Sequence, residues 1–271
     1  MKLENQSDFY LLYKPNSWTS QDLCTFFKKK YNFKKVGHSG TLDPSAEGLM
    51  LIATNKYTKL FDYIDNTHKT YEFEALFGFE SETNDTDSEL VEIESINLES
   101  KLEELETGIS GLTGNIKQVP PLYSAIKVKG KRLYKYARQE KEVELPIRDV
   151  AVNNFKLISY EGNQAKFIAT VSKGTYIRSL IVDLAKSIGT KAVVSSINRI
   201  EIGTLNKNNA NVIKNIEQLE RTIKPEPLDW RILFDIPTIS VEDSVLKDIK
   251  NGNFLKSSLF GTDVSHIIEN K

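Results

Sequence analysis

The stretch from Lys69 to Phe79 constrains the fold more than any other, because its apolar side chains recur at every second position. These side chains are Tyr71, Phe73, Ala75, Phe77 and Phe79. A period of two directs alternate side chains to one face of a β-strand. The stretch therefore predicts a half-buried strand, with Tyr71 on the face that points inward.

Other patterns indicate that the chain combines strands with helices. Apolar residues at helical spacing follow Gly174, and they are Ile177, Leu180, Ile181, Leu184, Ala185 and Ile188. Thr19, with Asp22 after it, predicts the start of an earlier helix. Further strands are expected over residues 9–13, 49–54, 150–160 and 165–172, the last two joined by a turn at 161–163. These periods indicate a chain that contains both strands and helices, and they do not give the order of the strands.

The net charge of −1 argues by itself against a nucleic-acid partner, yet the charges are segregated along the chain. Residues 28–35 hold five lysines and no acid, and residues 80–106 hold eleven acids and one lysine. A second basic run contains Lys117, Lys127, Lys129, Lys131, Arg132, Lys135 and Arg138. Each basic run is either a solvated face or a nucleic-acid contact. The interleaved rings of Tyr123, Tyr134 and Tyr136 favour RNA for the second run, because bases stack on such rings.

Several classes of protein are disfavoured by the composition. The single cysteine, Cys24, forms no internal disulfide, and a lone thiol without a Cys or His cluster makes no zinc site. No stretch approaches the roughly 20 apolar residues of a membrane span, and the N-terminus has no apolar signal core. We expect a cytoplasmic protein with no metal and no membrane association.

The loop GHSGTLDP gathers His38, Ser39 and Asp43, the residue types of a Ser-His-Asp hydrolase. The spacing speaks against that function, since adjacent His38 and Ser39 would have difficulty aligning an imidazole nitrogen on the hydroxyl. The loop also lacks the lysine of a phosphate-binding P-loop. Taken alone, it favours a turn whose polar side chains bond the local backbone over an active site.

Arg178 stands at the opening of the apolar-striped helix, where the helix dipole disfavours a cation. A compensating carboxylate is therefore expected near it. An arginine beside a nucleophilic aspartate would keep that carboxylate ionised. A surface arginine paired with any nearby acid fits the same pattern.

Five ordered segments make the chain resemble the bacterial TruB family of transfer RNA pseudouridine synthases over nearly its whole length. They are KPNSWTS, GHSGTLDPSAEGLMLI, KTYEFEALFG, QVPPLYSAIKVKGKRLYKYARQ and SKGTYIRSLIVDL. The resemblance implies a pseudouridine synthase fold of class α+β, with a mixed, mainly antiparallel sheet and flanking helices. It implies a catalytic domain over residues 1–228, with a thumb-like basic insertion at about 117–148, and a truncated C-terminal PUA-like segment over 229–271.

By the same resemblance, matching positions take the roles known for the family. Asp43 is the nucleophile, Tyr71 stacks on the target uracil and is a candidate acceptor of its C5 proton, and Arg178 is the partner of the Asp43 carboxylate. The other expected substrate-binding residues are His38, which enters the RNA helix, Lys59 near the active site, and Tyr176 and Ile197, which line the uridine pocket.

The implied reaction is the isomerisation of uridine-55 in the T-loop of transfer RNA to pseudouridine, after the base flips out of its stack. No cofactor is expected, the expected partner is the T-arm stem-loop of transfer RNA, and the protein is expected to be a monomer. Attack by Asp43 on C6 of the base and attack on C1′ of the ribose both stay open. Ser17, Ser39 and Asn198 depart from the family's pattern, and none of them removes a catalytic side chain.

Three rival functions remain. A synthase of this fold could act on another RNA, as guide-dependent relatives do, and a tRNA-folding chaperone would remodel the RNA without chemistry. A glycosidase would pair Asp43 with a second carboxylate, for which Glu47 and Asp85 are the nearest candidates. A product of unchanged mass would separate isomerisation from release of the base.

Overall fold

The computed structural model of the chain describes residues 3–64, 68–124, 126–128, 130–133, 136, 139, 143–209, 212–234 and 243–253. The chain divides into two compact units, Met1–Leu233 and Phe234–Lys271. The second unit contains helix α6 (Asp243–Asn251), and the other described elements lie in the first. Within these ranges, no helix combines the length and the apolar character needed to cross a lipid bilayer.

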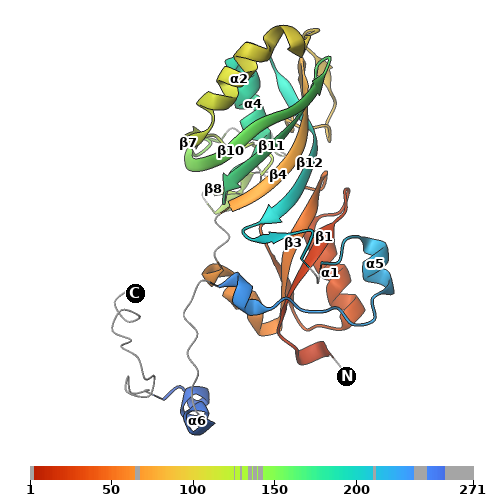
Figure 1. Cartoon of the computed structure of the whole chain (residues 1–271), viewed down its shortest axis with the longest axis vertical. Helices are drawn as coiled ribbons and strands as arrows, with labels where there is room; N and C mark the ends of the chain where they lie inside the picture. Colours follow the sequence, from red (N-terminus) through yellow and green to blue (C-terminus); the bar gives the residue numbers. More distant parts are fainter. Residues whose placement is uncertain are drawn as a thin grey trace. The chain divides into compact units, whose positions relative to one another are not determined.

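One large sheet organises the first unit (Figure 1). Its strands follow the order β1 (Phe9–Lys14), β3 (Ala46–Thr54), β12 (Ala192–Ile202), β4 (His68–Phe77), β11 (Gln164–Ser172), β10 (Arg148–Glu161) and β7 (Gly114–Gln118). Neighbours run antiparallel except β12 and β3, which run parallel. Two short strands extend this sheet: β2 (Val36–Ser39) pairs with β3, and β13 (Leu205–Asn206) pairs with β12. The expected mixed, mainly antiparallel sheet is confirmed.

Strand β4 lies in the middle of the sheet and shows the predicted alternation. Tyr71, Phe73 and Phe77 are buried, and the ring of Phe73 stacks on that of Phe167 in β11 with 5.6 Å between centroids. Burying a side chain of this size contributes about 1.5–3 kcal/mol relative to leaving it exposed. Such burial on one face fixes the register of the strand, because a slip by one residue would expose the whole set. Phe79, expected on the same face, instead begins the separate strand β5 (Phe79–Glu80), which pairs with β6 (Val91–Glu92).

Helices pack beside both halves of the sheet. Helix α1 (Ser20–Tyr31) begins with the predicted capping box of Thr19 and Asp22 and lies beside β1 and β3 (Figure 1). Helices α2 (Leu102–Gly111) and α4 (Ile177–Ser187) pack on each other beside the other half. The remaining short helices are η1 (Leu3–Asn5), η2 (Asn55–Tyr63), η3 (Leu98–Lys101), α5 (Ile216–Arg221) and η4 (Trp230–Leu233).

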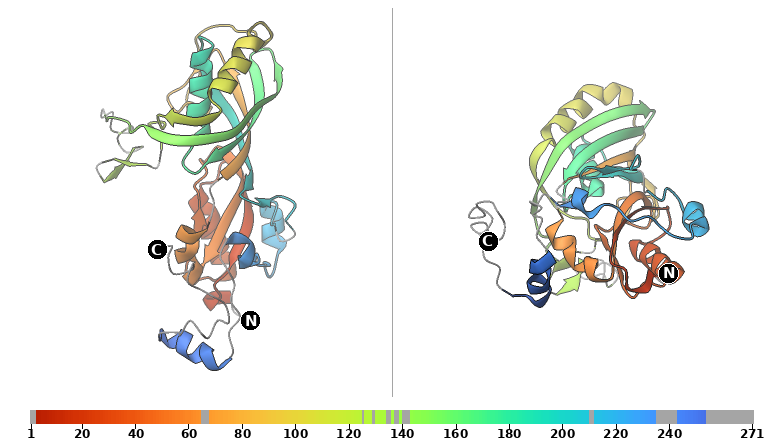
Figure 2. Two further views of the ribbon diagram at one scale, coloured as in Figure 1. Left: turned by 60° about the vertical axis from the view of Figure 1, so that its left-hand side comes forward. Right: turned by 60° about the horizontal axis from the view of Figure 1, so that its bottom comes forward.

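The predicted basic excursion is an insertion between two paired strands. Gln118 at the end of β7 lies opposite Arg148 at the start of β10, so the chain leaves and re-enters the sheet at adjacent places. The described part of the insertion includes a hairpin of β8 (Lys127–Val128) and β9 (Lys131–Arg132), which stands apart from the main sheet in Figure 2. The predicted RNA contacts of Lys129, Tyr134, Lys135 and Arg138 lie outside the described residues.

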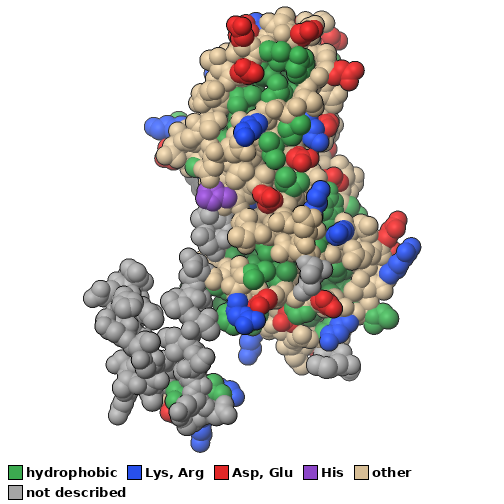
Figure 3. All heavy atoms as spheres, in the orientation of Figure 1, with side chains coloured by type: hydrophobic (Ala, Val, Ile, Leu, Met, Phe, Trp, Pro, Cys, Tyr) green, Lys and Arg blue, Asp and Glu red, His purple; other side chains and the backbone are tan. Residues whose placement is uncertain are grey.

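The acidic stretch forms its own region of the surface. Figure 3 shows carboxylates gathered at the end of the first unit that carries α2. Glu99, Glu103, Glu104 and Glu106 are exposed there. A polyanion is repelled from such a region, so the net charge of −1 hides a separation of acidic and basic surfaces.

Candidate active site

The loop that carries Asp43 joins β2 to β3 and is held by Ser17, before α1, and by Ser20, the first residue of α1. The Ser20 hydroxyl donates to the Leu42 carbonyl over 3.1 Å and accepts from the Leu42 amide over 2.9 Å. The Ser17 amide donates to the Pro44 carbonyl over 2.9 Å. The start of α1 therefore fixes the loop at Leu42 and Pro44, the residues on either side of Asp43.

Arg178 binds the Asp43 carboxylate from the first turn of α4. Its Nη2 donates to Asp43 Oδ2 over 2.6 Å, so the carboxylate expected near this helix start is present. The same guanidinium donates to the carbonyl of Thr83 over 2.8 Å and to that of Tyr123 over 3.0 Å. The Arg178 side chain is 4% exposed, whereas that of Asp43 is 36% exposed. A buried guanidinium thus holds a carboxylate that remains accessible.

Asp85 is a second carboxylate partner of Arg178. Its Oδ2 lies 3.4 Å from Arg178 Nη1, and its Oδ1 accepts bonds from the Thr83 hydroxyl and, over 3.0 Å, from the Asp87 amide. Burial raises the pKa of Asp85, while the Thr83 hydrogen bond and the Arg178 charge oppose that change. Both oxygens are therefore engaged in holding Arg178 and the loop around it.

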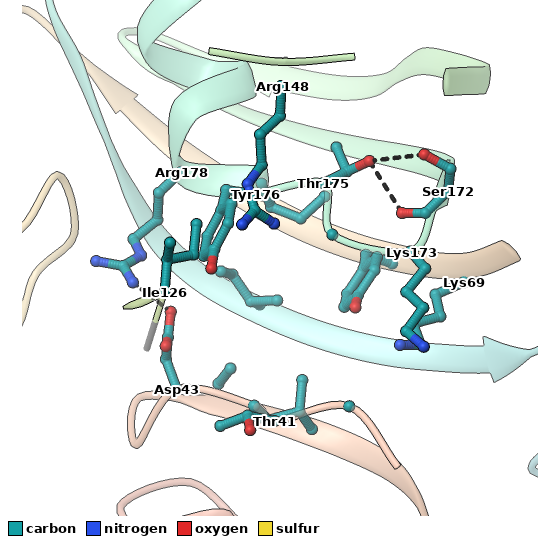
Figure 4. A pocket seen from close by; sticks show the side chains of 17 residues that line it. Thr41, Asp43, Lys69, Ile126, Arg148, Ser172, Lys173, Thr175, Tyr176 and Arg178 are labelled. Atoms are coloured by element: carbon teal, nitrogen blue, oxygen red, sulfur yellow. Dashed lines mark hydrogen bonds and ion pairs between the residues drawn. The ribbon is translucent and has the colours of Figure 1, made fainter. Parts of the chain in front are cut away.

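A cavity of about 390 Å³ opens beside the pair of Asp43 and Arg178 (Figure 4). Tyr71 of β4, Tyr176 before α4 and Ile197 of β12 also line it, so five of the residues expected in the site come together. They arrive from four separate parts of the chain. A volume in this range suits a small organic group, and aromatic walls suit a flat ring.

Gln118 fixes the position of Tyr176. Its side-chain oxygen accepts from the Tyr176 amide over 2.8 Å, and its side-chain nitrogen donates to the Tyr176 carbonyl over 3.1 Å. Burial raises the pKa of the Tyr176 phenol, so the ring stays uncharged near neutral pH. Because Gln118 also ends β7, the insertion begins at a residue that holds the cavity wall.

His38, near the end of β2, does not line this cavity. It lines a second hollow of about 700 Å³, together with Asp43 and Arg178. Within the described part of the chain, its buried Nδ1 has no hydrogen-bond partner. Burial lowers the pKa of His38, with smaller contributions from the charges of Arg199 and Lys69. The imidazole is therefore neutral near pH 7.

Two residues named in the sequence analysis lie outside both hollows. Lys59 is exposed on η2, and its role near the active site stays a prediction. Glu47 lies on β3 and also lines neither hollow.

Among the described residues, Asp43 is the only carboxylate in the lining of the first cavity. Asp85 and Asp87 line the second hollow with Asp43, but both oxygens of Asp85 are engaged by Arg178, Thr83 and the Asp87 amide. Asp85 is therefore a partner of Arg178 and not a free second carboxylate for a glycosidase.

Three basic side chains of the cavity had no role in the sequence analysis. They are Lys69 of β4, Arg148 at the start of β10, and Lys173 after β11. The sequence could have predicted Lys69 in the cavity, because it precedes Tyr71 by two residues and so lies on the same face of the strand. Arg148 and Lys173 stand at the ends of strands, where periodicity no longer indicates direction.

The arrangement offers one accessible carboxylate, held by a buried arginine, beside a pocket with aromatic walls. Such a carboxylate can act as a nucleophile on a ring bound in the pocket. Across the residues that the structure describes, no group of three or more His, Cys, Asp or Glu side chains is placed to hold a metal ion.

The sequence matches a known family model and many curated proteins. A model described as TruB family pseudouridylate synthase (N terminal domain) matches residues 28–177. The tRNA pseudouridine synthase B of Bacillus cytotoxicus is 36% identical over 258 residues, which cover 92% of this chain and 84% of that protein. The protein of the same name from Mesoplasma florum is 41% identical over 215 residues, which cover 79% and 75%. That of Caldanaerobacter subterraneus is 36% identical, with coverage of 90% and 85%.

Solved structures share the fold. A chain of a Cbf5-Nop10-Gar1 complex superposes with a TM-score of 0.58 at 25% identity, covering 79% of this chain and 53% of that chain. A chain of an H/ACA RNP bound to a substrate RNA containing 2′-deoxyuridine superposes with a TM-score of 0.56 at 22% identity, covering 76% and 50%. This chain thus spans about half the length of those two solved chains.

Proposed function

Because the chain belongs to the TruB family of pseudouridylate synthases, we propose that its target is the T-loop uridine of transfer RNA and that Asp43 is its nucleophile. Membership makes the chain a pseudouridine synthase, an isomerase of uridine in transfer RNA. One observation carries the proposal: the pair of Asp43 and Arg178 forms part of the wall of a cavity that Tyr71, Tyr176 and Ile197 also line.

The reaction balances without any added reagent. The bond between N1 of uracil and C1′ of the ribose breaks, a bond between C5 and C1′ forms, C5 loses a proton and N1 gains one. Asp43 forms a transient bond to C6 or to C1′ and is released at the end, while Arg178 holds its carboxylate in place. Tyr71 supplies the ring on which the uracil stacks and is the candidate acceptor of the C5 proton.

The uridine must leave its stack in the folded loop, which costs a few kcal/mol that contacts with the rest of the RNA must offset. His38, neutral and next to the second hollow, would enter the RNA helix in place of the base. The basic insertion at about 117–148 would close on the T-arm as a thumb, since Arg148 at its end lines the cavity and Gln118 near its start bonds Tyr176 of the cavity wall. Lys59 would add a contact to the RNA outside the cavity.

We extend the proposal to the organisation of the chain. Residues 1–228 would form the catalytic domain and residues 229–271 a PUA-like segment that contacts RNA. The protein would act as a monomer in the cytoplasm. These statements are supported by the resemblance of the sequence to its family alone.

The test compares Asp43→Asn with wild type on a T-arm stem-loop RNA. Wild type is expected to give a product of unchanged mass whose base is joined through carbon. Asp43→Asn is expected to bind this RNA and give no product, and Asp62→Asn, an exposed aspartate of η2, serves as the control with full activity. If Asp43→Asn still forms product, the assignment of Asp43 as the nucleophile is wrong. If wild type modifies whole transfer RNA outside the T-loop, the assignment of the T-loop uridine as the target is wrong. Release of free uracil would favour a glycosidase, and full rescue of a deletion strain by Asp43→Asn would favour a chaperone.

A further inference from the structure

Lys69 is a buried cation that faces the cavity. Its side chain lines the cavity although the residue is only 7% exposed. Among the described residues it has neither an ion pair nor a hydrogen bond through its ammonium group. Figure 4 shows Lys69 and Lys173 extending toward the same end of the cavity, away from Asp43 and Arg178.

Further positive charge surrounds this ammonium group. A Cβ built on Gly40 would lie 2.5 Å from Lys69 Nζ and 3.4 Å from Arg199 Nη1, so both cations lie against the same glycine. Arg199 uses its guanidinium to bond the carbonyls of Leu49, over 2.7 Å, and Gly40, over 3.2 Å. Burial, together with the charges of Arg199 and Lys173, lowers the pKa of Lys69 to about 8.

An ammonium group in this position is unfavourable in the free protein, because it has lost water and gained no anion. A ligand with a negative charge would remove that penalty when it bound. Gly40 keeps the approach open, since any side chain at this position would meet Lys69 Nζ. In RNA the negative charge lies on the phosphates, which lysine binds as a point charge.

Resting on the proposed function, we propose that this end of the cavity binds a backbone phosphate next to the target uridine, with Lys69 as its main ligand and Lys173 as its second. The nucleoside then lies between Asp43 and the two tyrosines, and the phosphate lies at the opposite end. Two points of one nucleotide are fixed in this way, so the distance from the sugar and base to the Asp43 carboxylate is set by the protein.

The first test measures binding of the T-arm stem-loop RNA over a range of salt concentrations. Lys69→Met is expected to bind about 10-fold more weakly or worse, as expected for a lost charged hydrogen bond. The slope of log affinity against log salt should shrink by about 0.7–0.9, the effect of one phosphate contact. Lys69→Arg should keep most of that slope, and Lys156→Met, an exposed lysine of β10, should change neither quantity. Wild-type affinity and slope in Lys69→Met would overturn the proposal.

The second test identifies the phosphate. RNAs are made with one uncharged methylphosphonate, either 5′ or 3′ to the target uridine. At the contacted linkage, this change should weaken binding to wild type and have no further effect on Lys69→Met. Losses that add at both linkages would overturn the assignment to the backbone. Competition of inorganic phosphate with the RNA for wild type, but not for Lys69→Met, would support an anion site at Lys69. If such competition is seen while the losses from Lys69→Met and from each methylphosphonate add, the site binds free anions and not the RNA backbone.

The pH dependence gives a third measurement. A bound phosphate raises the pKa of Lys69 above its value of about 8 in the free protein, so binding takes up a proton above that pH. Wild-type affinity should therefore be full below pH 8 and fall toward pH 9.5, and that fall should be smaller for Lys69→Met. Burial also lowers the pKa of Lys14 to about 8. Lys14 is present in both proteins, so its contribution to the pH dependence cancels when wild type is compared with Lys69→Met. His38, with a lowered pKa, is neutral throughout this range.

Thermal unfolding separates a phosphate ligand from a structural residue. Removal of an unpaired buried cation should leave the melting temperature of Lys69→Met unchanged or raised, and a marked fall would indicate a structural role instead. The two proposals also fail differently. A wild-type protein that binds the T-arm without modifying it contradicts the proposed function, while the salt slopes of the variants still decide the role of Lys69.

Discussion

Replacing Arg178 by methionine should destabilise the fold strongly, and the structure gives the size of the effect. The guanidinium is 4% exposed and lies 3.4 Å from the carboxylate of Asp85, whose side chain is 7% exposed. Removing one partner of such a buried pair costs about 3–5 kcal/mol, because the other charge is left uncompensated. That is a large part of the roughly 5–15 kcal/mol by which a domain is stable. The ion pair with Asp43 adds little to this loss, since that carboxylate is 36% exposed and screened by water.

The loss should depend on pH in a direction that identifies Asp85 as the cause. Burial already raises the pKa of Asp85, and Arg178 works against that rise. Without Arg178 the pKa of Asp85 in the folded state is higher still. A folded carboxyl with a raised pKa destabilises the protein fully above the folded pKa, and this penalty shrinks as the pH falls through the folded pKa toward the unfolded one. Arg178→Met should therefore be closer to wild type at pH 5 than at pH 8.

Urea unfolding at pH 5 and pH 8 measures both effects through the midpoint at constant slope. Adding Asp85→Asn to Arg178→Met should recover part of the stability at pH 8, because the uncompensated charge is then absent. The matched control is Arg231→Met, which breaks an exposed pair with Asp229 of 2.7 Å and should leave the midpoint unchanged. A loss below about 1 kcal/mol, or an equal loss at both pH values, would refute the reasoning about the buried pair.

Two further substitutions test the backbone around the site. Gly48→Ala should lower the free energy of unfolding by about 3 kcal/mol or more, measured with urea. The reason is that φ at Gly48 is 119° and an added Cβ would lie 2.4 Å from the Arg199 carbonyl oxygen, which the sheet holds in place. A wild-type midpoint would contradict this close approach. Ser17→Gly should raise the free energy of unfolding by about 0.5 kcal/mol. Ser17 has a φ of 68°, and the strain of that conformation exceeds the extra entropy that glycine has in the unfolded chain. A lower melting temperature in differential scanning calorimetry would contradict this balance.

Local sequence patterns predicted individual strands and helices, and one contact between side chains. The alternation in β4 predicted that Tyr71 faces inward, and the helical stripe predicted α4. Arg178 at the start of that helix predicted an anion close by, which is Asp43. Each of these conclusions follows from residues within one turn or one strand, or from a charge that must be balanced somewhere.

What the patterns missed depends on contacts between distant segments. Strand β12 lies between β3 and β4, which places Ile197 opposite Ala46 on one side and Phe73 on the other, and no local period encodes that neighbourhood. Asp85 looked like an unpaired loop carboxylate, because only the tertiary fold brings it to Arg178. Lys69 was overlooked for a different reason, since a polar residue near the end of a strand usually reaches water.

The pairing of Gln118 with Arg148 also bears on how such a protein can diverge. The segment between these residues starts and ends at one pair of opposite residues in two neighbouring strands, so each doubling of its length costs only about 0.6 kcal/mol in closure entropy. The segment also supplies Ile126 to the cavity lining and the Tyr123 carbonyl to Arg178, so its length and charge can change in evolution only where these two contacts are kept. A lineage could therefore alter the rest of the segment and keep the pair of Asp43 and Arg178 in place.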